Sequence, residues 1–294
     1  MVVHKDFNVI CSIGCSYFHS ATEGEEKTRT NYAPEYEKHY KKGLLGSDGL
    51  EIAHYRDNTF EKLVASKCLA ESVNLSVRGA SNSSIFRKAM HWLQSSSSTH
   101  GHYDRVLVIG LTELLRESRY NVERKIWENI HISDMMWSEQ ASYLSEHKEG
   151  GLEWYRKDRF PYIEKEWWDK YWKTQVKYFS EIDILEQDLL HQIELLSCYC
   201  EINKVQVLFV NNLVDYVSFK VYSKYKEAND LGLMTERFKG EIRHRNLLMF
   251  PNGSCSLRRF LHSTNTGYNG AHPNSADHLE LAKVVYERIT KKTW

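Results

Sequence analysis

Two side chains near opposite ends of the sequence have the chemistry of a nucleophile and a base. Ser16 follows Gly14 and Cys15 at the end of a short apolar run, and a glycine there lets the backbone turn sharply and expose the next hydroxyl. His272 stands between a glycine turn and Pro273, a good position for a general base. A serine after a strand is also a common helix N-cap, so Ser16 alone indicates either a nucleophile or a cap.

Two further segments carry donors of the kind that stabilise an oxyanion. They run from Gly79 to Asn82 and from Gly110 to Glu113. Each begins with a glycine after an apolar run and brings a short polar side chain, Asn82 in the first and Thr112 in the second. Backbone N–H groups and such side chains hold the negative charge that develops in acyl transfer. Either segment alone is common in α/β proteins, so the prediction depends on their combination.

In this order along the chain, the four segments resemble the characteristic blocks of the SGNH (GDSL-type) hydrolase superfamily. The family's Gly-Asp-Ser block is matched by Gly14-Cys15-Ser16, and its Asp-x-x-His-Pro block by the run from Asn269 to Pro273. Its second block supplies a glycine, matched by Gly79, and its Gly-x-Asn-Asp block is matched by the run from Gly110 to Glu113.

The resemblance implies a role for each of these residues. Ser16 is then the nucleophile, His272 the base, and Asn269 the residue that orients the imidazole. The oxyanion hole is then formed by the N–H groups of Ser16 and Gly79, together with Thr112 or Asn82.

Three positions depart from the family's pattern. Cys15 replaces the aspartate of the first block, Thr112 replaces the donating asparagine, and Asn269 replaces the aspartate that orients the histidine. In a serine protease triad, the same Asp-to-Asn exchange costs about four orders of magnitude in rate, although a Ser-His dyad can still react. The Gly-x-Thr variant with Arg116 soon after it is similar to small SGNH-like proteins of bacteriophages.

These features predict a serine esterase or deacylase that cleaves an acyl ester on a small molecule or a carbohydrate, with no metal or organic cofactor. The replacements at Thr112 and Asn269 leave a second hypothesis open. In it, the chain is an SGNH-like protein with a degenerate catalytic site that serves binding or assembly. A nucleotide-binding module is disfavoured, because no G-x-G-x-x-G or phosphate-binding G-x-x-x-x-G-K follows any apolar run.

The elements that must position these residues alternate along the chain. Apolar runs predict strands at Asn8–Ile13, Val73–Val77, Arg105–Gly110 and Val205–Val210. Helical spacing predicts helices over about 60–71, from Asn82 or Ser83 through Leu93, over 182–196 and over 275–291. Short apolar strands that alternate with helices are typical of a parallel sheet covered on both faces. We therefore predict an α/β fold, a flavodoxin-like three-layer α/β/α arrangement with the site beyond the carboxyl ends of the strands.

The middle of the chain differs in composition from the rest. Residues of the segment from about 113 to 181 include six of the eight Trp among many charges, and we predict a mostly helical insertion within a single domain that covers residues 1–294. Trp168, Trp172, Val176 and Phe179 fall near helical spacing, which favours packing. The alternative is that exposed rings stack on sugars. Residues 211–268 give no clear pattern.

Composition restricts the partners. Lys plus Arg and Asp plus Glu are 39 each, so no overall charge attracts the chain to nucleic acid or to a membrane. No apolar run approaches the roughly 18 residues of a membrane span, and the N-terminus lacks the pattern of a signal peptide. We expect a cytoplasmic protein, or a virion-associated one if a phage encodes it, whose oligomeric state the sequence does not define. The six cysteines are scattered and are interpreted as reduced packing residues.

Overall fold

Four short runs of the chain pair as parallel strands in the order β2-β1-β3-β6. The computed structural model describes residues 7–15, 18, 59–77, 80–95, 104–112, 116–122, 125–131, 164–168, 170, 182–212, 246–254, 256–266 and 273–293. The strands are β1 (Val9–Ile13), β2 (Glu71–Asn74), β3 (Arg105–Leu111) and β6 (Val205–Asn211). β3 is buried along its whole length, as a central strand covered on both faces must be. The prediction of a parallel sheet is confirmed.

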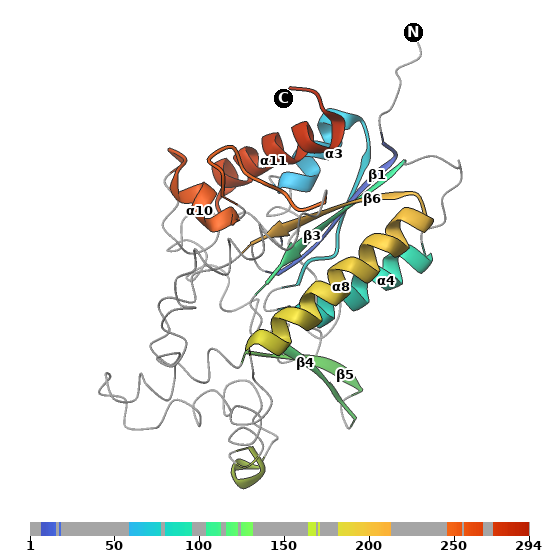
Figure 1. The fold of residues 1–294 in the computed structure, drawn as a ribbon, viewed down its shortest axis with the longest axis vertical. Coiled ribbons are helices and arrows are strands. Elements are labelled where there is room, and N and C mark those ends of the chain that lie inside the picture. The colour runs from blue at the N-terminus through green and yellow to red at the C-terminus, as the bar shows by residue number, and fades with distance from the viewer. Residues whose placement is uncertain are drawn as a thin grey trace, which may run out of the picture.

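Helices cover both faces of this sheet, α3 and α11 on one face and α4 and α8 on the other (Figure 1). Successive strand side chains point to opposite faces, so Val106 and Val108 pack with α3 and α11 while Leu107 and Ile109 pack with α4 and α8. The helices are α3 (Phe60–Cys68), α4 (Asn82–Ser95), α8 (Ile182–Ile202), α10 (Leu257–His262) and α11 (Ser275–Thr290). This is the predicted three-layer α/β/α arrangement.

The stretch after residue 245, for which no element was predicted, continues the sheet beside β6. The Phe209 N–H donates to the Asn246 carbonyl at 2.8 Å, and the Leu248 N–H donates to the Phe209 carbonyl at 2.9 Å. A second parallel bridge joins Asn211 to Ser256. Ser256 then caps α10, because its side chain accepts from the Arg259 N–H.

Two predicted boundaries between α3 and β2 were wrong. The helix ends at Cys68 rather than near residue 71, because Leu69 takes a left-handed conformation with φ of 57°. The strand therefore starts earlier than predicted, at Glu71. The residues after β2 still run beside β1. The Leu75 N–H donates to the Ser12 carbonyl, and the Val77 N–H donates to the Gly14 carbonyl.

The cap of α4 also differs from the prediction. Asn82 is the first residue of the helix, and the hydroxyl of Ser81 accepts from the Ser84 N–H at 3.2 Å. The capping side chain is thus Ser81 rather than Asn82 or Ser83. The Asn82 side chain instead contacts Thr112 at the end of β3.

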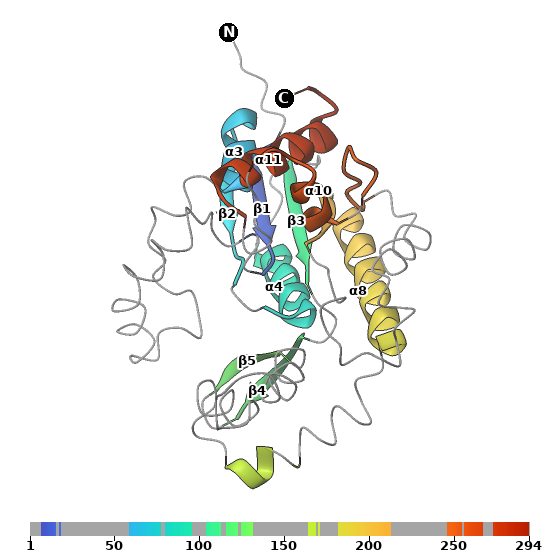
Figure 2. The same ribbon diagram turned by 90° about the vertical axis from the view of Figure 1, so that its left-hand side faces the viewer.

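The predicted helical insertion contains an antiparallel hairpin of β4 (Arg116–Asn121) and β5 (Ile126–His131). The prediction of helix is wrong for this part. The turn carries Lys125 at a φ of 54° without a glycine, so the usual hairpin signal is missing from the sequence. Figure 2 shows the hairpin beyond the ends of β3 and α4. The Arg87 guanidinium of α4 bonds Ser118 at 3.0 Å and lies 3.6 Å from the Trp127 ring centroid.

The structure describes three tryptophans of this segment, and they differ in exposure. Trp168 is fully buried, with 1% of its surface exposed, whereas Trp127 and Trp167 are about half exposed. Packing therefore accounts for Trp168. Trp172, Val176 and Phe179 lie outside the described residues, and the extent of the single domain and its insertion stays a prediction.

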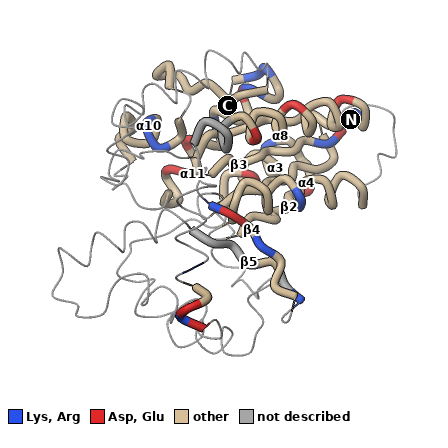
Figure 3. Tube along the Cα trace, turned by 60° about the horizontal axis from the view of Figure 1, so that its bottom comes forward, with Lys and Arg blue, Asp and Glu red and all other residues tan. Residues whose placement is uncertain are grey.

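Charges of both signs are interspersed along the described elements (Figure 3). No helix among the described residues combines the length and the apolar character needed to cross a bilayer. None of the five described cysteines forms a disulfide, and four of them are buried. Cys198 is exposed, which departs from the expectation of packing, and Cys255 lies outside the described residues.

Candidate functional site

The ends of three neighbouring strands bring polar residues together at one edge of the sheet. β1 is followed by Gly14 and Cys15, β3 by Thr112, and β6 by Asn212. The strands are parallel and in register, with Ile13 opposite Ile109. The residues that follow them therefore meet at the carboxyl edge, where open α/β sheets bind their ligands.

Asn82 and Thr112, both predicted for the oxyanion hole, bond to each other reciprocally. The Asn82 side-chain amide donates to the Thr112 carbonyl at 2.9 Å, and the Asn82 carbonyl oxygen accepts from the Thr112 N–H at 2.8 Å. Both residues are buried. The pair fixes the start of α4 against the end of β3, so the second and third predicted segments form one unit.

The Thr112 hydroxyl takes no part in these two bonds, which use the Thr112 backbone. Its oxygen is buried and has no hydrogen-bond partner among the described residues. Burying an unpaired hydroxyl costs free energy. A hydroxyl kept in this state at the carboxyl edge has the chemistry of a donor to a bound ligand.

Phe18, which follows Ser16 by two positions in the sequence, is anchored to the end of β1. The Phe18 N–H donates to the Cys15 carbonyl at 3.0 Å, and the Phe18 ring is completely buried. A Cβ on Gly14 would lie 2.9 Å from this ring, so only glycine lets the ring fold back over the end of β1. The residues described on either side of Ser16 in the sequence, Cys15 and Phe18, are therefore both held at the end of β1.

Asn212 is a site residue that the sequence analysis missed. It is fully buried, and its side-chain Oδ1 has no partner among the described residues. Its Nδ2 lies 4.0 Å from the Cys15 sulfur and would be 2.3 Å from a Cβ on Gly110. The amide thus occupies the space above Gly110, beside the residue that precedes Ser16. The only signal in the sequence is a pair of asparagines directly after a strand.

Thr266 and Asn274, which stand before and after the stretch of sequence with Asn269 and His272, are bonded to each other and to Asp277. On one side the Thr266 hydroxyl donates to the Asp277 carboxylate. On the other, the Asn274 side chain caps α11 and the Asp277 carboxylate accepts from the Asn274 N–H. The Asn274 side-chain amide also donates to the Thr266 carbonyl at 3.3 Å. Asp277 therefore has a structural role, as its position in the first helical turn predicts.

His278 connects α11 to α3. Its Nδ1 accepts from the Phe60 N–H at 3.2 Å, and its ring stacks on the Phe60 ring with 6.3 Å between the centroids. The other side of this contact is Phe18, whose ring lies 4.5 Å from that of Phe60. One phenylalanine of α3 is thus in contact with residues that flank both Ser16 and His272 in the sequence.

Of the six predicted site residues, the structure describes Asn82 and Thr112 and brings them together. Ser16, Gly79, Asn269 and His272 lie outside the described residues, and their roles stay predictions. Within the described ranges, no three His, Cys, Asp or Glu side chains gather in a way that could hold a metal ion.

Two buried thiols have raised pKa values. Burial raises the pKa of Cys11, and the nearby Glu61 carboxylate raises it further. Burial raises the pKa of Cys200 to about 12, although the Arg105 guanidinium opposes the shift. Both thiols are therefore protonated at neutral pH and are poor nucleophiles.

The fold is similar to that of several solved structures. One is TesA, with a TM-score of 0.41, 10% identity, and 97% of this chain and 99% of that chain covered. Another is a member of the lipolytic protein G-D-S-L family from Veillonella parvula, with a TM-score of 0.41, 10% identity, and 95% and 96% covered. A single-substitution variant of Axe2, an acetyl xylan esterase from Geobacillus stearothermophilus, has a TM-score of 0.38 and 12% identity, with 98% and 96% covered.

No protein-family model matches the sequence, and no curated protein matches it. The class that the fold and the site define is a three-layer α/β/α protein with buried polar side chains at the carboxyl edge of its sheet. A function for this chain has to be argued from its own residues.

Proposed function

We propose that this protein is a serine hydrolase of acyl esters, with Ser16 as the nucleophile and His272 as the base. The Ser16 Oγ would attack the ester carbonyl carbon while His272 takes the hydroxyl proton and passes it to the leaving alkoxide. Water then hydrolyses the acyl-enzyme by the same two residues. The proposed substrate class is an acyl ester on a small molecule or a carbohydrate.

The observation that carries this proposal is the contact of Phe18, Phe60 and His278. Phe18 follows Ser16 by two positions and His278 follows His272 by six, and both rings contact Phe60. The two ends of the chain are therefore packed against one residue of α3. Such convergence is what a nucleophile and a base at opposite ends of a sequence require.

The oxyanion donors are supported by a second contact. Because Asn82 and Thr112 bond each other, the segment after Gly79 and the end of β3 stay at a fixed separation. We propose that the N–H groups of Ser16 and Gly79 and the Thr112 hydroxyl bind the oxyanion. Asn82 holds Thr112 in place through both of its side-chain polar atoms, so we assign it a positioning role and assign the side-chain donation to the Thr112 hydroxyl.

The orienting residue is Asn269 in this proposal. An asparagine oxygen can accept from the imidazole N–H but adds no negative charge to stabilise the imidazolium. We therefore expect slower turnover than an aspartate would give, and Asn269→Asp tests this as a gain of activity.

The experiment is the hydrolysis of p-nitrophenyl acetate by the wild type and by Ser16→Ala. The variant should lose activity by roughly 10³-fold or more, because no other group replaces the attacking oxygen. Circular dichroism and thermal unfolding check that the variant is folded.

Ser12→Ala is the matched control. Ser12 lies on β1, and its hydroxyl is buried without a partner among the described residues, so the control removes a similar group four positions before Ser16. It should keep the wild-type rate. Equal rates in wild type and Ser16→Ala would remove Ser16 as the nucleophile, and a folded wild type that cleaves no ester would favour a binding or assembly role.

A further inference from the structure

The side chain of Asn74, the last residue of β2, bonds three separate segments at the carboxyl edge. Its Nδ2 donates to the Phe18 carbonyl and to the Glu61 Oε1, each at 2.9 Å. Its Oδ1 accepts from the Ser76 N–H at 2.9 Å. Two donors and one acceptor fix the orientation of the amide, because a flipped amide would place its oxygen against two other oxygens.

Two of these partners are close in sequence to the proposed catalytic groups Ser16 and Gly79. Phe18 follows Ser16 by two positions, and its N–H donates to the carbonyl of Cys15, the residue just before Ser16. Ser76 comes three residues before Gly79, and the Val77 N–H that follows it donates to the Gly14 carbonyl at 3.0 Å. One side chain therefore sets the position of the nucleophile's turn relative to the approach to the predicted oxyanion glycine.

The third partner, Glu61, makes this arrangement rigid. Glu61 is 2% exposed, and its Oε1 also accepts from the Thr59 hydroxyl. A buried carboxylate that accepts from neighbouring donors binds them more strongly than a neutral oxygen does. Glu61 belongs to α3, the helix whose Phe60 N–H bonds His278. The network thus also connects to the helix that follows His272.

We propose that Asn74 is a positioning residue for the ester hydrolysis, acting through the Phe18 carbonyl and the Ser76 N–H to align the Ser16 hydroxyl with the oxyanion donors. This inference rests on the proposed function. Asn74 does not touch the reacting atoms in this view. Its loss should therefore slow the chemical step without weakening substrate binding.

The test compares Asn74→Ala with wild type in p-nitrophenyl acetate hydrolysis, with kcat and KM measured separately. We expect kcat to fall by about 10²-fold and KM to change by less than about threefold, because a small misplacement of catalytic groups costs a rate of this order. Asn74→Ser serves as a second variant. Its hydroxyl can still bond the Ser76 N–H but is too short to bridge Phe18 and Glu61, so the local turn remains and the same loss of kcat is expected.

Asn203→Ala is the matched control. The Asn203 side chain also donates to a backbone carbonyl, that of Tyr199 at 2.8 Å, but it lies at the opposite edge, before β6. The control should lower the melting temperature less than the Asn74 variants do, because it removes one hydrogen bond rather than three, and kcat should stay at the wild-type value when all proteins are assayed well below their melting temperatures. A merely structural role for Asn74 would give the same kcat in all of these proteins.

The outcomes separate this inference from the proposed function. An inactive wild type overturns both. An active wild type whose Asn74 variants keep kcat within about threefold of the control, or raise KM alone, overturns only the positioning role of Asn74. A selective loss of kcat in both Asn74 variants supports it.

Discussion

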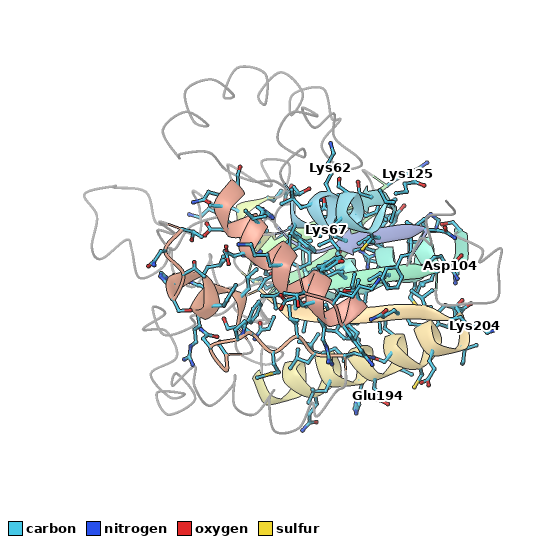
Figure 4. The ribbon with its side chains drawn as sticks, turned by 90° about the horizontal axis from the view of Figure 1, so that it is seen from above. Lys62, Lys67, Asp104, Lys125, Glu194 and Lys204 are labelled. Atoms are coloured by element: carbon cyan, nitrogen blue, oxygen red, sulfur yellow. The ribbon has the colours of Figure 1, made fainter. Side chains whose placement is uncertain are left out.

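The amino edge and the carboxyl edge of the central sheet both carry asparagines and other polar residues, but in different surroundings. At the amino edge, the Asn8 side-chain amide donates to the Asp104 carboxylate at 3.1 Å in an exposed contact. The other Asp104 oxygen lies 3.8 Å from the Arg105 Nε. Figure 4 labels Asp104 and Lys204 on this side of the molecule. The Arg105 side chain is itself buried and also donates to the Asn203 carbonyl at 3.0 Å, so the polar groups described at this edge pair with one another.

At the carboxyl edge the polar side chains are buried among strand ends. Asn82 and Thr112 bond each other, and Asn74 joins three segments. The Thr112 hydroxyl and the Asn212 Oδ1 are buried without a partner among the described residues. An unpaired buried polar group costs about 1–3 kcal/mol. The comparison teaches that the amino edge pairs its polar groups with one another, whereas the carboxyl edge keeps two buried oxygens for which the proposed function provides a use.

The largest effect that separates the two edges should come from Thr112→Val. Valine has nearly the same shape, and the backbone bonds to Asn82 remain, so the change removes only the hydroxyl. We expect kcat for p-nitrophenyl acetate to fall by about 10²-fold, the usual cost of one oxyanion donor. Stability in urea should not fall, because the deleted hydroxyl has no partner among the described residues.

Two companion variants make this result specific. Thr112→Ser keeps the donor and should retain most of the activity. Asn8→Ala removes an amide at the amino edge and should leave kcat within about twofold, as expected for an exposed contact. If Thr112→Val hydrolyses the ester as fast as wild type, the hydroxyl is not a donor to the oxyanion.

A smaller effect on activity, with a larger one on stability, should follow Gly110→Ala. The new Cβ would lie 2.3 Å from the Asn212 Nδ2 and 2.9 Å from the Phe18 ring. Overpacking of this kind costs about 1–3 kcal/mol. Because Phe18 follows the proposed nucleophile Ser16 by two positions, we also expect kcat to fall about tenfold. Urea unfolding measures the loss of stability, and initial rates measure the loss of activity. If Gly110→Ala is as stable as the wild type, Asn212 and Phe18 do not pack tightly against Gly110.

The smallest effect on activity is expected from alkylation of α8 near the amino edge. Cys198 is exposed, while Cys200 is buried with its pKa raised to about 12. At about pH 8, iodoacetamide should modify Cys198 and spare Cys200, because only the thiolate reacts. Peptide mass spectrometry reads out the sites, with urea-denatured protein as the control in which both react. Ester hydrolysis should not change on modification of Cys198. Equal labelling of the two thiols in the folded protein would contradict their difference in burial.

The sequence predicted the sheet well because its signals are local. Apolar runs such as Arg105–Leu111 are continuous, and a central strand buried on both faces must have such a run. The last helix was predicted over 275–291 and runs over Ser275–Thr290. It starts after a capping asparagine and keeps one apolar face along its length, and both features are local signals.

The hairpin and the network around Asn74 were not predicted, for physical reasons. The β4 and β5 strands carry charged residues and turn at Lys125 without a glycine, so neither alternation nor a turn motif marks them. Asn74 and Asn212 acquire their roles from residues distant in sequence. Asn74 meets Phe18, and Asn212 lies against Gly110. Contacts of that separation leave no pattern in a single sequence.

The most direct test of the central claim is covalent labelling of the full chain with an organophosphonate ester, which traps an activated serine. Intact mass and peptide mapping should show one phosphonyl group, on Ser16, in the wild type and in Ser12→Ala. The adduct should be absent from His272→Ala, because the hydroxyl then lacks its base. A folded wild type that takes up no phosphonyl group, or takes it up at a serine other than Ser16, would contradict the assignment of the nucleophile.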